Sequence, residues 1–486
     1  MITAKLQEPL LSELSQAGKQ AYTLRKSSIK EYHKNLDGKF TRTDVDLPEL
    51  SEVEVVRHFT RLSTKNYGVD TGMYPLGSCT MKYNPKINED IAAKEGLAYS
   101  HPLFGEEQAQ GSLEIIYTLQ ELLKTITGFS HITLNPMAGA QAELAGILIT
   151  RAYFEDKKEK RHTILVPDLA HGTNPASAAL GNFKTQEIKC GKQGILEASL
   201  VEQYMTNDIA ALMITNPNTL GLFEEEILKI TKIVHDHGGL VYMDGANLNA
   251  LLGITKIAPM GVDLMHINLH KTFSTPHGGG GPGAGPLCVN EKLSPYLPIP
   301  LVTKNGTTYS LITETKKSIG RMGLFQGNFG ILVRALTYIL SLGNENIKKV
   351  SEAAIIAANY IKEHLKNDYH LPYTKDCMHE CIFTDKFQKE NGVTTLNIAK
   401  SLLDYGIHPP TVYFPLVVSG ALMIEPTECE SKRNLDHFIS VMKELAADAK
   451  TNPDKLKNAP RETPVKRVDE VNAVKNLVLT WKKIIS

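Results

Sequence analysis

The 486-residue sequence has no excess of charge of either sign, because 53 lysine and arginine residues balance 53 aspartate and glutamate residues. Proteins that bind nucleic acid or anionic membranes mainly through electrostatics carry surplus lysine and arginine. A formal net charge of zero therefore argues against both kinds of partner.

The sequence also lacks a long apolar run and a recognisable leader. No stretch of about 18 apolar residues is present, so no membrane-spanning helix is expected. The N-terminus has no apolar segment followed by a small-residue cleavage site, and this favours a cytoplasmic protein.

Sequence motifs for metal sites are missing as well. The six cysteines are scattered, and only Cys377 and Cys381 lie close together, without the second pair or histidine cluster that a zinc site needs. The HExxH and GxSxG patterns are absent. We therefore expect reduced thiols and no metal site.

The chain is longer than one hydrophobic core usually supports, so several parts are expected. We predict an extended arm over residues 1–85, a large domain over 86–330, and a smaller α+β domain with a C-terminal extension over 331–486. From residue 132 to 273, strand-like segments alternate with helical ones. This pattern predicts an α/β fold with a mainly parallel sheet covered on both faces, in which ligands gather at the carboxyl ends of the strands.

Two ionisable residues follow apolar strands of this predicted sheet. Asp244 comes directly after LVYM, and Lys271 follows DLMHINL, so both should emerge at the same edge. A pyridoxal phosphate enzyme needs this pair: the lysine amine forms an imine with the cofactor, and the carboxylate keeps the ring nitrogen protonated so that the ring accepts electrons. Taken alone, such a pair is more often structural.

The segment NPMAGAQAELAG supplies a turn suited to a phosphate. Ala138, Gly139 and Ala140 let the backbone approach an anion where a helix begins with free N–H groups, and Gln141 is a further candidate donor. A tight strand-to-helix turn without a ligand explains the same residues equally well.

Polar residues follow two more strands. His171, in VPDLAHGTNPASAA, is placed where a flat ring stacks on a cofactor, and Thr173 and Asn174 add polar groups beside it. Thr215 or Asn216 is a candidate hydrogen-bond partner for the ring hydroxyl, although formation of a turn alone explains N-P-N-T.

The run HGGGGPGAGP contains a G-x-G-x-x-G match at Gly278, Gly280 and Gly283. A dinucleotide-binding turn should follow a strand and open a helix, whereas this run follows a lysine-containing loop, carries two prolines and leads into the strand-like PLCV. We therefore interpret it as a closely packed loop bordering the cofactor.

With these residues assembled, the chain resembles the glycine decarboxylase P-protein family, and specifically its cofactor-bearing C-terminal half, which is subunit 2 of the two-subunit form. The resemblance rests on YPLGSCTMKYNP, HPLFGEEQAQG, AHGTNPASAA, MDGANLNA and LHKTFSTPHGGGGPGAGP.

The resemblance implies a fold-type-I pyridoxal phosphate architecture. It also implies that Lys271 holds the cofactor, that Asp244 pairs with the ring nitrogen and that His171 stacks on the ring. The same resemblance makes Ala138, Gly139, Ala140 and Gln141 the phosphate cradle. Thr173, Thr215 and Asn247 are further candidate cofactor contacts, and His270 and Asn268 are weaker candidates for phosphate contacts.

The resemblance further implies the activity of a glycine dehydrogenase (aminomethyl-transferring, decarboxylating) of the glycine cleavage system. Glycine would lose its carboxylate, and the aminomethyl group would pass to the lipoyl arm of an H-protein. A separate subunit 1 in an α₂β₂ heterotetramer is expected, and the SCTMK segment with Cys79 could approach the site. Two alternatives stay open: another fold-type-I enzyme, such as a desulfurase or an aminotransferase, or a non-catalytic scaffold subunit.

Overall fold

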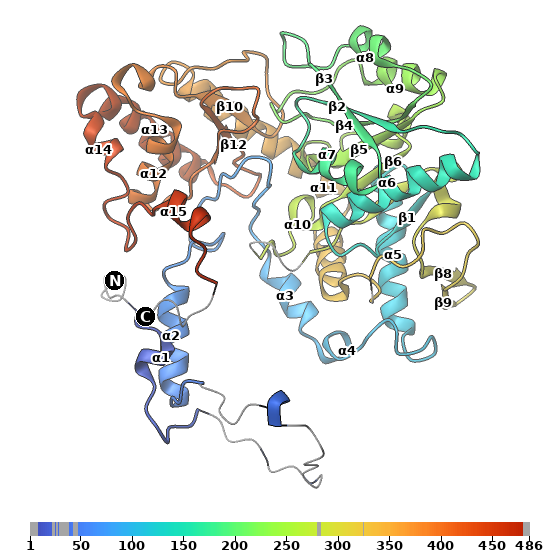
Figure 1. Cartoon of the computed structure of the whole chain (residues 1–486), viewed down its shortest axis with the longest axis horizontal. Helices are drawn as coiled ribbons and strands as arrows, with labels where there is room; N and C mark the ends of the chain where they lie inside the picture. The colour runs from blue at the N-terminus through green and yellow to red at the C-terminus, as the bar shows by residue number, and fades with distance from the viewer. Residues whose placement is uncertain are drawn as a thin grey trace. The chain divides into compact units, whose positions relative to one another are not determined.

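The computed structural model describes residues 8–21, 25, 28, 38–41, 47–278, 283–323 and 325–479. The chain forms two compact units, Gly72–Ala459 and the combination of Met1–Thr71 with Pro460–Ser486 (Figure 1). The predicted domain boundaries near residues 85 and 330 stay a prediction.

A seven-stranded sheet forms the centre of the larger unit, in the order β1-β7-β6-β5-β4-β2-β3 (Figure 1). Strands β2 to β6 run parallel to one another, while β7 runs antiparallel to both β6 and β1. The strands are β1 (His131–Thr133), β2 (Thr163–Pro167), β3 (Lys184–Ile188), β4 (Ile209–Thr215), β5 (Leu240–Gly245), β6 (Leu264–Ile267) and β7 (Leu287–Val289). The prediction of a mainly parallel sheet is confirmed.

Helices cover both faces of this sheet because its buried strands present apolar side chains on each side. In β5, Tyr242 packs in the cluster that contains residues of α6, whereas Val241 and Met243 pack in the cluster that contains α5, α8, α9 and α11. The helices before α11 are α3 (Lys86–Ala92), α4 (Glu95–Ala98), α5 (Gln110–Thr127), α6 (Gly139–Asp156), α7 (Thr173–Leu180), α8 (Ala198–Tyr204), α9 (Ile227–Asp236) and α10 (Leu269–Thr272). Short 3-10 turns are η3 (Leu248–Ala250), η4 (Ala258–Met260) and η5 (Glu291–Tyr296), and β8 (Leu301–Asn305) pairs with β9 (Thr308–Ile312).

A smaller antiparallel sheet follows, in the order β10-β12-β11. Its strands are β10 (Cys381–Thr384), β11 (Thr411–Val412) and β12 (Ala421–Ile424); the helices around it are α11 (Phe329–Leu365), η6 (Gln388–Asn391), α12 (Thr395–Asp404), α13 (Lys432–Thr451) and α14 (Pro453–Lys457). Helix α11 changes direction at Gly343, whose φ of 65° is non-helical, so two helical stretches meet there. Leu76, from the start of the unit, pairs with Ile424 and places the segment Pro75–Thr80 beside this sheet.

The second unit contains α1 (Leu11–Leu14), η2 (Gly38–Phe40), α2 (Glu52–Ser63) and α15 (Glu470–Lys475). Within it, Glu8 accepts hydrogen bonds from Arg61 at 2.6 Å and lies 3.0 Å from the ring of His58. Among the described residues of the whole chain, no helix is both long and apolar enough to cross a membrane.

Candidate active site

The carboxyl ends of the parallel strands open onto a cavity of about 500 Å³. Asp244 lies at the end of β5, and Lys271 lies on α10, which begins two residues after β6 ends. Eight of the eleven residues predicted for the site line this cavity: Ala138, Gly139, Ala140, His171, Thr173, Asp244, His270 and Lys271. Sequence segments separated by more than 100 residues therefore converge at one sheet edge.

Asp244 is the most heavily contacted carboxylate of the cavity. Its Oδ2 lies 2.9 Å from His171 Nδ1 and accepts a hydrogen bond from Asn174 Nδ2 at 3.1 Å. Its Oδ1 accepts from the backbone N–H of Ala246 at 2.9 Å and lies 3.2 Å from His266 Nε2. Burial alone would raise the pKa of this carboxyl, but His266 and His171 hold it well below its ordinary value. Asp244 is therefore an ionised acceptor inside the protein.

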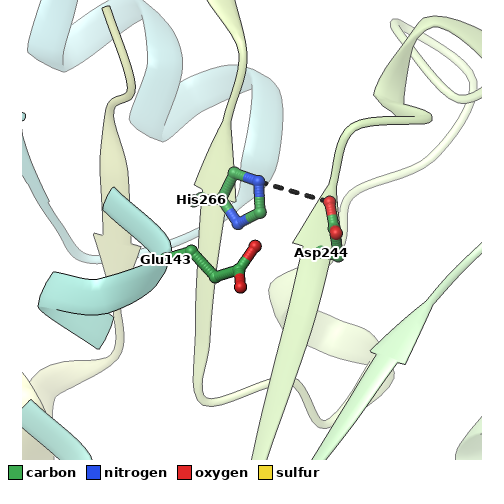
Figure 2. A group of neighbouring side chains, drawn as sticks. All are labelled: Glu143, Asp244 and His266. Carbon is green, nitrogen blue, oxygen red and sulfur yellow. Dashed lines mark ion pairs between the residues drawn. The ribbon is translucent and has the colours of Figure 1, made fainter. Parts of the chain in front are cut away.

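The network behind Asp244 includes two residues that the sequence did not single out, Glu143 and His266 (Figure 2). His266 Nδ1 lies 2.7 Å from the hydroxyl of Tyr242, which fixes the ring so that Nε2 points to Asp244. Glu143 accepts from Thr173 Oγ1 at 3.0 Å, and burial raises the pKa of its carboxyl. These three ligand-type side chains lie close together, but Asp244 and His266 are already paired with each other. His266 is therefore explained as a support that orients Asp244, and Glu143 as the partner of Thr173.

Lys271 is buried, with 8% of its surface exposed, and its ammonium donates a 2.8 Å hydrogen bond to the backbone carbonyl of Ser78. The Ser78 hydroxyl lies 2.6 Å from His171 Nε2. Ser78 thus contacts two of the three predicted catalytic residues at once. In the sequence, Ser78 belongs to the SCTMK segment, in which only Cys79 was considered as a functional residue. Cys79 does line the cavity, and burial raises the pKa of its thiol.

The start of α6 forms one wall of the cavity, and at Gly139 it lies close against Asn268. A Cβ atom at Gly139 would lie 1.9 Å from Asn268 Nδ2, so only glycine allows this approach. The first N–H groups of an α-helix have no acceptor within the helix and carry positive partial charge. Asn268 also presents a buried Oδ1 that has no hydrogen-bond partner among the described residues. These features fit a phosphate group with a polar neighbour.

Three predicted residues do not line the cavity. The Gln141 amide is engaged elsewhere, because its Oε1 accepts from the backbone N–H of Met137 and its Nε2 donates to the carbonyl of Met322, both at 2.7 Å. Asn247 donates to the carbonyl of Pro217 at 2.9 Å. Thr215 is buried beside Asp244 in the register of β4 and β5.

Two histidines near Lys271 also line the cavity, His270 and His277. The rings of His270 and His277 meet edge to face with centroids 4.9 Å apart. Burial, followed by the charge of Lys271, lowers the pKa of His270 to about 3, so its ring is neutral. In the adjoining glycine run, Gly283 lines the cavity and Gly278 is described, whereas residues 279–282, including Gly280 of the dinucleotide-like match, lie outside the described residues.

Comparison with known proteins identifies the family. A "Probable glycine dehydrogenase (decarboxylating) subunit 2" from Caldanaerobacter subterraneus subsp. tengcongensis is 51% identical over 480 residues, covering 98% of this chain and 99% of that relative. A relative of the same description from Chlorobium chlorochromatii is 52% identical over 478 residues, with 98% and 99% coverage. This chain belongs to the glycine dehydrogenase (decarboxylating) subunit 2 family. The predicted family and enzyme class are confirmed.

Models of two protein families match parts of the chain: "Glycine dehydrogenase, C-terminal domain" at residues 350–466 and "Aminotransferase class-V" at residues 141–376. The family is therefore one of pyridoxal phosphate-dependent enzymes with the fold-type-I architecture.

Solved structures agree on the fold. The crystal structure of an inhibitor-bound glycine decarboxylase (P-protein) of the glycine cleavage system has a TM-score of 0.72 at 18% identity, covering 84% of this chain and 93% of that one. A NifS-like protein has a TM-score of 0.60 at 15% identity, covering 77% of this chain and 99% of that one. At these identities the likeness shows the fold alone.

Proposed function

We propose that this chain is the cofactor-bearing subunit of a glycine decarboxylase, which binds pyridoxal 5′-phosphate covalently through Lys271. The observation that carries the proposal is the meeting of Lys271 with an ionised Asp244 in one cavity beside the start of α6. When bound, the cofactor would supply an electron sink for the carbanion that forms when glycine loses its carboxylate.

The protein residues have distinct tasks in this proposal. Asp244 supplies the negative charge that keeps a ring nitrogen protonated, and four hydrogen-bonding or ionic partners prevent it from turning away. The N-terminus of α6, with Ala138, Gly139 and Ala140, receives the phosphate, and Thr173 lies beside it. Gln141, Thr215, Asn247 and His270 remain predicted contacts, the first three of them away from the cavity lining.

In this proposal, the ring of His171 packs flat against the cofactor. Its two ring nitrogens are held by Asp244 and Ser78, at 2.9 and 2.6 Å, so rotation of the ring would break both contacts. Lys271 is the only lysine among the residues that line the cavity, which supports its assignment as the imine-forming amine.

The same proposal includes the partners. The relatives' description as subunit 2 supports a separate subunit 1, with which this chain would form an α₂β₂ heterotetramer. The aminomethyl group would pass to the lipoyl arm of an H-protein. Glycine–bicarbonate exchange, measured with this chain alone, with subunit 1, and with both subunit 1 and H-protein, tests these partners in turn.

Covalent attachment at Lys271 gives the direct test. Purified protein supplied with pyridoxal phosphate and reduced with borohydride should gain the mass of one cofactor, located at Lys271 by peptide mapping. Lys271→Ala and Lys271→Arg should both lose this label, and Lys271→Arg controls for the loss of positive charge. A label retained in both variants would overturn the assignment.

The role of Asp244 needs a separate measurement. Asp244→Asn keeps the shape of the side chain but removes its charge, so the labelled lysine should remain. Glycine–bicarbonate exchange should fall by about a hundredfold or more, the scale of losing one preorganised electrostatic contact. Exchange within a few-fold of the unchanged protein would contradict the role of Asp244.

A further inference from the structure

A second ionisable cluster lies beside the cavity, outside the residues that line it. His379, Glu380 and Glu425 are completely buried, and one potential ligand atom of each lies within 4.8 Å of the others. Among the described residues, neither ring nitrogen of His379 has a hydrogen-bond partner, and the same holds for Oε1 of both glutamates. Polar atoms in such a setting need a proton, a water molecule or an ion.

The two glutamates hold the segment that touches Lys271. Glu380 Oε2 accepts from the backbone N–H of Ser78 at 2.9 Å, and Glu425 Oε2 accepts from that of Thr80 at 3.1 Å. Ser78 and Thr80 have φ angles of 66° and 40°, in the left-handed region that side-chain-bearing residues rarely adopt. The two carboxylates therefore stabilise a turn whose backbone conformation is unfavourable for residues with side chains.

Further hydrogen bonds attach the same segment to the small sheet. Thr411 Oγ1 donates to the carbonyl of Gly77 at 2.7 Å, and the backbone N–H of Glu425 donates to the carbonyl of Pro75 at 3.3 Å. Ser78 then reaches the large sheet through its carbonyl to Lys271 and its hydroxyl to His171. The placement of Ser78 depends on contacts with both sheets.

The charge of the pair follows from its surroundings. Burial raises the pKa values of both carboxyls, the charge of Glu425 adds to the rise at Glu380, and Lys271 opposes the rise at both. Burial, Lys271 and His171 lower the pKa of His379 to about 3, so this ring supplies no positive charge. Two carboxylates this close cannot easily ionise together. Other ionisable groups that interact with the pair are the Glu428 carboxylate and the thiols of Cys79, Cys377 and Cys381.

We propose that Glu380 and Glu425 share one proton and act as a single positioning unit, which presents one negative charge to Lys271 and holds the Ser78–Thr80 turn. This inference rests on the proposed function insofar as Lys271 is the amine that attaches the cofactor. The glutamates do not contact the cavity, so they act on the chemistry through Ser78 and Lys271.

Glutamine substitutions separate the possible charge states. In Glu380→Gln or Glu425→Gln, the amide replaces the shared proton and the remaining glutamate keeps the single negative charge. The pH profile of borohydride-trapped pyridoxal phosphate should therefore stay within about 0.3 pH unit of that of the unchanged chain. The double variant removes the charge and should shift the profile midpoint to lower pH by about one unit, a tenfold change in the protonation equilibrium.

Other results would overturn the proposal. A shift in both single variants would mean that both carboxyls are ionised, and an unshifted double variant would mean that both are protonated. Stoichiometric metal in the purified full-length chain, lost in either single variant on elemental analysis, would show a metal site instead. Glu224→Gln is the matched control, because burial raises the pKa of Glu224 to about 7 in a place unconnected to Ser78; its trapping profile should not move.

A measurement without cofactor keeps this inference distinct from the proposed function. A carboxyl pair that retains a proton in the folded chain loses stability as pH rises from the ordinary glutamate value toward its raised pKa. The unchanged chain should therefore lose more thermal stability between about pH 5 and 7 than Glu380→Gln does. Parallel profiles would overturn the shared proton, whereas failure of trapping alone would overturn only the role of Lys271.

Discussion

Two buried charged clusters hold the segment between Pro75 and Asn84, and they solve the problem of buried charge in opposite ways. At one end, the Lys82 ammonium has Glu428 Oε1 at 2.6 Å, the Thr272 carbonyl at 2.8 Å and Asn249 Oδ1 at 3.0 Å. At the other end, two carboxyl groups of the same kind, Glu380 and Glu425, lie together, and each has an oxygen with no hydrogen-bond partner among the described residues.

The two clusters differ in how their charge responds to pH. Burial lowers the pKa of Lys82, but Glu428 together with Tyr338 and Cys429 raises it above the ordinary value, so this ion pair persists over a wide pH range. The glutamate pair changes charge when its proton leaves. Lys82 contacts the end of α10, and Ser78 contacts Lys271 on the same helix. The helix that carries Lys271 is therefore held both by an ion pair of constant charge and by a carboxyl pair whose charge changes with pH.

Removing one partner of the fixed pair should have the largest effect. Glu428→Ala leaves the Lys82 ammonium buried without its counter-charge, which costs about 3–5 kcal/mol of unfolding free energy. Chemical denaturation of the full chain measures this loss. Glu428→Gln retains a hydrogen-bond acceptor and should lose less; a loss below about 1 kcal/mol in Glu428→Ala would show that Lys82 reaches water.

An intermediate effect is expected at the titratable pair. Glu380→Ala leaves the Ser78 N–H without its buried acceptor, a loss of about 1–3 kcal/mol in the same denaturation experiment. Glu380→Gln keeps an acceptor oxygen and should lose less than about 1 kcal/mol. Equal losses in both variants would show that charge, rather than the hydrogen bond, matters for folding.

The smallest effect concerns His379 in mild acid. Because its pKa falls from 6.5 to about 3 on folding, the unfolded chain binds a proton first, and stability is lost as pH falls below about 6.5. His379→Gln should remove at most about 1.4 kcal/mol of this loss per pH unit, seen as a shallower thermal-stability profile between pH 6.5 and 5.5. Superimposable slopes would mean that the folded protein protonates His379 readily.

The sequence located the parts of the site that follow from the sheet. Asp244, Lys271 and the turn at residues 138–140 all follow apolar strands, and parallel strands bring their carboxyl ends to one edge. Position at the start of a helix does not determine the direction of a side chain, however. Gln141 turns its amide to Met137 and Met322 instead of the cavity.

Ser78, Glu380 and Glu425 could not be found by the same reasoning. The Ser78–Glu380 and Thr80–Glu425 contacts join residues 302 and 345 positions apart, from an irregular segment to the small sheet. The periodicity of apolar residues along a sequence does not predict contacts between such distant residues. Nor does the sequence distinguish a buried glutamate from one at the surface. His266 was hidden for a related reason, since it lies within an apolar strand and its ring faces Asp244 only through the pairing of β5 with β6.

The reversed direction of β7 has a consequence for the lysine segment. Strand β6 ends at the cavity edge at Ile267, and β7, being antiparallel, begins at that same edge at Leu287. The intervening stretch therefore starts and finishes on the cavity side. One inverted strand thus holds both ends of the stretch that carries Lys271, His277 and Gly283 at the cavity edge, so these three residues line the cavity from a segment fixed at two points.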